Sequence, residues 1–180
     1  CPTDDILRES LNPFQAMLSA WFNQSLERET SENWKQYLAR FQTLAANLHD
    51  APDERVPDIY KRLHRIQTIL ADLTGIHLGT DSEYSDPELR FTNNLLALTA
   101  FLQAQALVKP LVLHVEDAHY LDDESWQFIL DIPRRLADFP IALVLTCRPQ
   151  GPFAVPLSPE TAVFGTRLFL QSFTETEMQV

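Results

Sequence analysis

Two adjacent carboxylates, Glu116 and Asp117, follow directly after the apolar run "LVLHV" at residues 111–115. A short run of consecutive apolar, β-branched residues is typical of a strand that a parallel sheet buries on both faces. Ligands of open parallel sheets bind at the carboxyl ends of the strands. The sequence therefore predicts a functional site at Glu116 and Asp117.

Such an acid pair could support phosphoryl-transfer chemistry. One carboxylate can hold a divalent metal ion while the other orients or deprotonates a water molecule. Successive strand residues point in different directions, so the two acids can serve separate roles. A solvated strand end before a helix start would also be acidic, but strand, acid pair and context together favour the functional interpretation.

A second apolar run, "IALVLTCRP" at residues 141–149, ends in Thr146 and then Arg148. If its strand neighbours the first, Arg148 would emerge beside the acid pair, where a guanidinium could sense or stabilise a terminal phosphate. By spacing alone, a surface arginine before a proline turn explains Arg148 equally well. His114 and His119 lack clustered partners, so we expect structural roles for them.

The segment between the two runs predicts the helix of a strand-helix-strand crossover. We expect Asp122 to cap this helix, and the next two acids to complement its dipole rather than bind metal. Pro133 should kink or split the helix. Farther on, residues 166–171 predict a third strand, and Thr174 begins a capping box.

Upstream of residue 110, apolar residues recur every three or four positions, which is the period of helices with one buried face. Asn12, Pro13 and Gln15 predict a capped helix start, and Gly75 suits a left-handed helix C-terminus. The aromatic residues on these faces are expected to form core. The expected helical segments are 13–21, 34–50, 59–73 and 91–106.

The ordered set of apolar strand, "EDAHYLD", amphipathic helix, apolar strand and "TCRP" resembles the Walker B and sensor 1 region of AAA-related STAND signalling ATPases. The segment "NPFQAML" is similar to the family's helix after its second strand, and "RLFLQSFTETE" to its last core strand. The resemblance implies that Glu116 coordinates magnesium and Asp117 activates water. Because the first acid is more often Asp in the wider class, which of the two contacts Mg²⁺ stays open. Arg148 matches the sensor 1 arginine.

The fold class that this resemblance implies is α/β, a partial P-loop NTPase core with a parallel sheet flanked by helices. Residues 1–180 would form one partial ATPase domain, mainly helical over 1–109. Its strand-helix-strand core would span 110–170, and 171–180 would start the next helical module. The cofactors would be ATP and Mg²⁺. The partner would be an attached output domain, a cyclase, kinase or transcriptional regulator, with self-association possible on activation.

The phosphate-cradling motif G-x-x-x-x-G-K-[ST] is missing from these 180 residues. In the family this loop lies upstream of the point where this chain begins. We therefore expect the chain alone to bind nucleotide poorly and to be inactive as a fragment. One alternative is a nucleotide-independent interaction scaffold that keeps the ATPase fold. Another is a metal-dependent hydrolase, which would need further acids or histidines near the pair.

Composition and charge argue against several functional and structural classes. The 180 residues are 45% hydrophobic and carry a net charge of −11, with only 14 Lys and Arg, which argues against direct nucleic-acid binding. No apolar run approaches the roughly 20 residues that span a bilayer. Two cysteines are too few for a disulfide framework. We expect a soluble, cytoplasmic domain.

Overall fold

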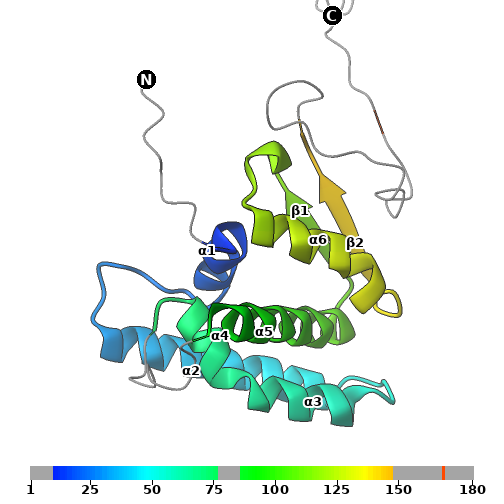
Figure 1. The fold of residues 1–180 in the computed structure, drawn as a ribbon. Helices are drawn as coiled ribbons and strands as arrows, with labels where there is room; N and C mark the ends of the chain where they lie inside the picture. The colour runs from blue at the N-terminus through cyan, green and yellow to red at the C-terminus, as the bar shows by residue number, and fades with distance from the viewer. Residues whose placement is uncertain (1–9, 77–85, 148–167, 169–180) are drawn as a thin grey trace, which may run out of the picture.

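The computed structural model describes residues 10–76, 86–147 and 168. The described residues form helices, one short 3-10 helix and two strands (Figure 1). In chain order these are α1 (Asn12–Trp21), α2 (Thr30–His49), α3 (Val56–Arg65), α4 (Gln67–Leu73), α5 (Pro87–Val108), β1 (Leu111–Val115), η1 (Ala118–Tyr120), α6 (Asp123–Arg135) and β2 (Ile141–Leu145). Apart from Leu168, which is exposed and is not assigned to a strand, the predicted third strand at 166–171 lies outside the described residues, as do the capping box at Thr174 and Arg148.

Helix α5 lies at the centre of the fold. Figure 1 shows it between α2, α3 and α4 on one side and the β1-α6-β2 unit on the other. Its buried residues, which include Leu98, Phe101 and Leu102, are distributed around the helix rather than along one stripe. A helix that is apolar on all sides is buried on all sides, so α5 joins the helical layer to the sheet.

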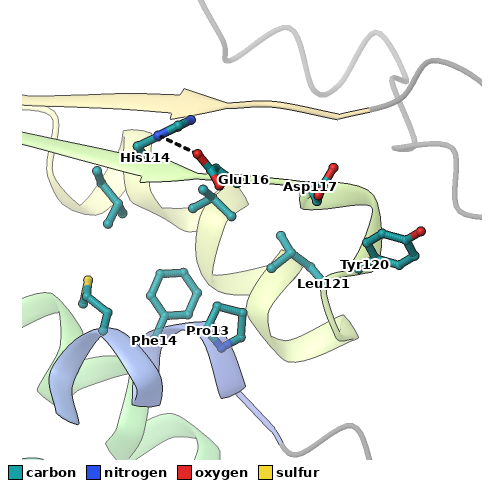
Figure 2. Close-up of a pocket in the computed structure, with 10 residues that line it drawn as sticks. Pro13, Phe14, His114, Glu116, Asp117, Tyr120 and Leu121 are labelled. Carbon is teal, nitrogen blue, oxygen red and sulfur yellow. Dashed lines mark ion pairs between the residues drawn. The ribbon is translucent and has the colours of Figure 1, made fainter. Parts of the chain in front are cut away.

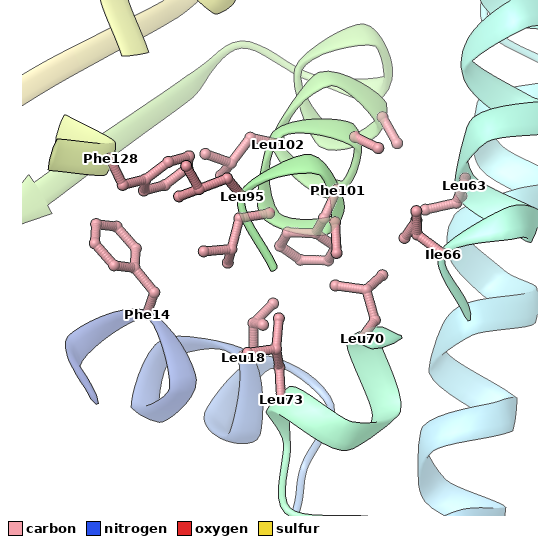
Figure 3. Close-up of a cluster of buried hydrophobic side chains, with 14 of the residues drawn as sticks. Phe14, Leu18, Leu63, Ile66, Leu70, Leu73, Leu95, Phe101, Leu102 and Phe128 are labelled. Carbon is pink, nitrogen blue, oxygen red and sulfur yellow. The ribbon is translucent and has the colours of Figure 1, made fainter. Parts of the chain in front are cut away.

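Aromatic side chains connect α1 to α6 and to α5. Phe14 meets Phe128 of α6 edge to face, with ring centroids 4.8 Å apart (Figure 3). At the other end of α1, Trp21 meets Phe101 of α5 at 5.1 Å. Such pairs each add about 1 kcal/mol beyond the area they bury. The expectation that the aromatic residues form core is confirmed for these positions, and α1 is fixed at both ends.

Two of the predicted helix boundaries are wrong. The N-cap of α1 is Leu11, in the left-handed region at φ 59°, rather than Asn12, and no side chain caps the helix. The Gln15 side-chain amide donates to the Ser10 carbonyl instead of completing a capping box. The helix predicted over 59–73 divides into α3 and α4 at Ile66, which is buried.

Gly75 ends α4 as predicted, at φ 83°. The amide of Ile76 donates to the carbonyl of Ala71, and that of Gly75 to Asp72, which is the paired bonding of a Schellman motif. A left-handed residue is needed there, so glycine is the residue with no steric cost.

The strand-helix-strand prediction is confirmed. Strands β1 and β2 pair in parallel, with Leu111 opposite Ile141 and Val115 opposite Leu145, and α6 is the crossover between them (Figure 1). Asp122 caps α6 as predicted. Pro133 does not split the helix, since α6 continues to Arg135. Pro133 costs the helix one backbone hydrogen bond, and α6 ends only two residues after it.

The prediction that the strands are buried on both faces is wrong for the described residues. Leu113 and Val115 point into the core, whereas Val112 is 65% exposed and Val144 is 44% exposed. Within the described part of the chain, the helices cover one face of the sheet only (Figure 1). The consecutive apolar pattern therefore leaves an apolar outer face.

A polar clamp ties the two halves of the fold together. The Arg55 guanidinium donates to the Asp53 carboxylate and to the carbonyl of Asp138, and stacks 4.5 Å from the centre of the Phe139 ring. The segment before α3 is thereby attached to the segment before β2. Hydrogen bonds from the Arg55 side chain and then its backbone amide lower the pKa of Asp53 to about 2.

Asp53→Asn should lower the free energy of unfolding near pH 7, and this loss should shrink at acid pH. Because the pKa of Asp53 is lowered, its contribution is present above about pH 4 and is lost as pH falls through about 2. Denaturant unfolding should show the wild type more stable than the variant near pH 7, with the difference shrinking at acid pH. Glu27→Gln, which removes an exposed acid elsewhere, serves as the control. A difference that stays constant over the whole range would contradict the clamp.

Candidate functional site

Glu116 and Asp117 lie immediately after the last residue of β1, as the sequence predicts. Figure 2 shows the Glu116 side chain turned toward His114 and Asp117 farther along the segment, toward η1. Both carboxylates face solvent, with side chains 80% exposed for Glu116 and 64% exposed for Asp117. They are therefore accessible to a metal ion or a phosphate group from outside the protein.

The backbone of Asp117 adopts the left-handed region, at φ 48° and ψ 43°. This conformation is uncommon for a residue other than glycine and persists where surrounding contacts fix it. It ends the strand and interrupts the alternation of side chains, so the direction of the Asp117 carboxylate is set by the turn rather than by β1. The acid pair is thus placed by local backbone geometry.

Thr146, one residue beyond β2, supplies the contacts that hold this turn. The Asp117 amide donates to the Thr146 hydroxyl at 3.3 Å, and the Ala118 amide donates to the Thr146 carbonyl at 2.8 Å. The Thr146 amide in turn donates to the carbonyl of Val115 at 3.0 Å. The parallel ladder therefore continues past the strands and ends on the acid pair.

Each of the two acids has a histidine nearby. The Nδ1 atom of His114 lies 3.9 Å from Oε1 of Glu116, and that of His119 lies 3.9 Å from Oδ1 of Asp117. These separations exceed hydrogen-bond length, so the contacts are electrostatic at most. His119 is buried with its ring against Tyr120, and His114 is exposed on the outer face of β1. The expected structural role suits His119 better than His114.

A cavity of about 260 Å³ opens beside the acid pair (Figure 2). Its floor is apolar and comes from the first turns of α1, from β1 and from Leu121, while the acid pair and Tyr120 lie on its rim. An apolar hollow with a few polar groups at its edge is the usual form of a ligand site. Among the residues that line it are Pro13, Phe14, Met17, Leu113 and Val115.

The later acids are used structurally. Asp122 is buried, and its carboxylate accepts hydrogen bonds from the amide and the hydroxyl of Ser125 at 2.8 and 2.6 Å. Burial raises the pKa of Glu124, and the charge of Asp122 raises it further. The described residues contain no cluster of three or more His, Cys, Asp or Glu side chains that could enclose a metal ion. A direct metal hydrolase thus gains no support.

The predicted pairing of Arg148 with the acids lies outside the described residues. Thr146, which the sequence indicated only as a strand end, is the described residue of the second run that reaches the pair. No pattern within either strand identifies Thr146, because its contact follows from the register between the two strands. Val115 pairs with Leu145, so the residue after Leu145 must meet the residue after β1.

Comparison of the chain with protein-family models, with curated proteins and with solved structures gave no match. Over the described ranges, no helix is both long enough and apolar enough to cross a bilayer. The observations that bear on the function of this chain are therefore the geometry and the contacts of the acid pair.

Replacing Thr146 should release the turn at Asp117. Thr146→Val keeps the size and branching of the side chain but removes the hydroxyl that accepts the Asp117 amide. Amide hydrogen exchange at Asp117 should accelerate, because the amide loses its acceptor, while exchange in α2 should not change. Thr146→Ser, which keeps the hydroxyl, should exchange like the wild type. Amide exchange at Asp117 that is as slow in Thr146→Val as in the wild type would contradict the contact.

Proposed function

We propose that this chain is part of an ATP-binding and ATP-hydrolysing regulatory module, in which Glu116 and Asp117 serve as the Walker B acids. One observation carries the proposal: an exposed acid pair at the carboxyl end of a parallel strand, with Asp117 held in a left-handed turn by Thr146 of the neighbouring strand. Backbone strain maintained by specific contacts is typical of functional sites.

The donor set fits magnesium. Mg²⁺ is usually held by one or two carboxylates together with waters and substrate phosphates, rather than by a cage of protein ligands. Glu116 and Asp117 offer two exposed carboxylates, and even with His114 and His119 nearby the described residues form no group of three or more ligands that would enclose the ion. Bound Mg²⁺ would neutralise charge that develops on transferring phosphate oxygens.

The two acids would divide the work between them. In the proposed arrangement Glu116 holds the cation, and Asp117 orients a water molecule and accepts its proton. Asp117 is the alternative ligand of the cation, because both carboxylates are solvent-exposed and lie on adjacent residues. Arg148 would sense the terminal phosphate from the end of the second run.

The proposed work of the module is regulatory. Nucleotide state would shift the segment that bears the acids, and the shift would pass to an output domain attached in the same polypeptide. That output domain would be a cyclase, a kinase or a transcriptional regulator, with self-association on activation. The negative charge of the chain, −11, favours an indirect effect on nucleic acid over direct contact.

A nucleotide-independent scaffold is the second candidate. It is favoured by the apolar outer face of the sheet, where Val112 and Val144 are exposed. Exposed apolar residues on a sheet can serve protein contacts. ATP binding by the natural polypeptide that carries these residues distinguishes the two candidates.

Asp117→Asn should greatly slow ATP turnover without abolishing ATP binding. In the natural polypeptide that carries these residues, we expect ATP hydrolysis to slow by roughly a hundredfold or more, because the amide cannot accept the proton. ATP affinity should change little, since contacts to the base and most phosphate contacts would be unaltered. Steady-state turnover and equilibrium binding of ATP measure the two quantities.

Asp123→Asn is the matched control for this experiment. It makes the same chemical change at an exposed residue in the first turn of α6, and it should leave turnover near the wild-type rate. Normal turnover in Asp117→Asn would sink the role assigned to Asp117. Absence of ATP binding in the wild type would favour the scaffold.

A further inference from the structure

The segment that bears the acid pair is anchored at both ends. At its start, Thr146 holds the amides of Asp117 and Ala118. At its far end, the buried carboxylate of Asp122 accepts three hydrogen bonds, two of them from Ser125 in the first turn of α6. Between the anchors, η1 is a single tight turn, with the Tyr120 amide donating to the carbonyl of Asp117. Displacement of one end must therefore disturb the other.

The third bond of Asp122 crosses the fold. The backbone amide of Leu11 donates to Oδ1 of Asp122 at 3.3 Å, and the two residues are 111 positions apart in the chain. Leu11 is fully buried and left-handed, at φ 59°. The residues that follow it, Pro13 and Phe14, line the cavity beside the acid pair.

Leu11 and Asp117 thus share an unusual feature. Both are non-glycine residues with positive φ, and the amide of each donates to a side-chain oxygen from a distant part of the sequence. Strained backbone of this kind persists only where tertiary contacts fix it. The acceptors are Asp122 for Leu11 and Thr146 for Asp117.

We propose that Asp122 is a positioning residue for the acid pair, acting by fixing the far end of the acid-bearing segment to both α6 and the start of α1. Its carboxylate is buried and fully engaged, so it does not bind the cation itself. The proposal rests on the proposed function, because positioning matters for activity only if Glu116 and Asp117 bind a cation. It predicts that a displacement of α1 changes the positions of Glu116 and Asp117.

An ordinary helix cap would behave differently, and the chain contains one for comparison. Asp86 caps α5 by accepting from the Glu88 amide at 3.0 Å, on an exposed part of the chain. Serine is about as good an N-cap as aspartate. Asp122→Ser should therefore keep the cap of α6 while its single, shorter oxygen leaves Leu11 without its acceptor. Asp86→Ser is the matched control.

The experiment uses the 180-residue chain, labelled with nitrogen-15, and titrates it with manganese as the probe for a magnesium site. In the wild type, paramagnetic broadening should centre on the amides of Glu116 and Asp117. Asp122→Ser should weaken manganese binding by about tenfold, as is usual when a residue that supports a metal ligand is changed. It should also accelerate hydrogen exchange at Asp117. Asp86→Ser should change neither quantity.

Asp122→Asn separates positioning from charge. Its side-chain oxygen can still accept from Leu11 and Ser125, so it should retain manganese binding within about twofold of the wild type if geometry is what matters. Loss of binding in the asparagine variant equal to that in the serine variant would overturn the positioning role and assign the effect to charge. Far-UV circular dichroism confirms that each variant keeps its helices.

Two outcomes separate this proposal from the proposed function. If the wild type binds manganese and Asp122→Ser binds it equally well, the positioning role is overturned. The proposed cation site would not be affected by that result. Absence of manganese binding in the wild type, with exchange at Asp117 still accelerated by Asp122→Ser but not by Asp86→Ser, would support the positioning and overturn the cation site.

Discussion

The parallel register of β1 and β2 is the constraint on which the acid pair depends. Because Val115 pairs with Leu145, Thr146 is placed beside the first residues after β1, and its amide, carbonyl and hydroxyl are all engaged there. A shift of one residue would remove the hydroxyl from Asp117 and turn the strand side chains to opposite faces. The left-handed turn at Asp117 is therefore a consequence of register.

The helices make that register possible. Parallel strands need a crossover, which α6 supplies, and α6 packs on α5 and on α1. The central position of α5 joins the sheet to the helical layer, and Phe14 of α1 contacts Phe128 of α6 (Figure 3). Packing of this kind fixes the strands more firmly than a two-stranded sheet could by itself. The site is thus supported by the buried face of the sheet, and no element of the described residues covers the other face.

The sequence predicted the elements that depend on local pattern. Apolar periodicity indicated the helices, and the Asp122 and Gly75 signals located two helix ends, because capping is a short-range property. The break at Ile66 and the left-handed Leu11 were missed. The conformation of Leu11 depends on a tertiary contact, because its amide donates to Asp122, which lies 111 residues away.

The candidate site was likewise predicted only in the part that depends on local sequence pattern. An apolar run that ends in acids is visible in the sequence, so the position of Glu116 and Asp117 after a strand was expected and is confirmed. The contact of Thr146 with Asp117 depends on pairing between strands 30 residues apart, which the pattern of either strand alone does not specify. The apolar outer face was also missed, because apolar runs report hydrophobicity and not what covers them.

The most direct measurement is a high-resolution structure of the natural polypeptide that carries these residues, with Mg²⁺ and a non-hydrolysable ATP analogue. We expect a cation about 2.1 Å from a carboxylate oxygen of Glu116 or Asp117, or one bridging water away, with Asp117 still left-handed and bonded to Thr146. Nucleotide and cation bound elsewhere, with both carboxylates free in solvent, would contradict it.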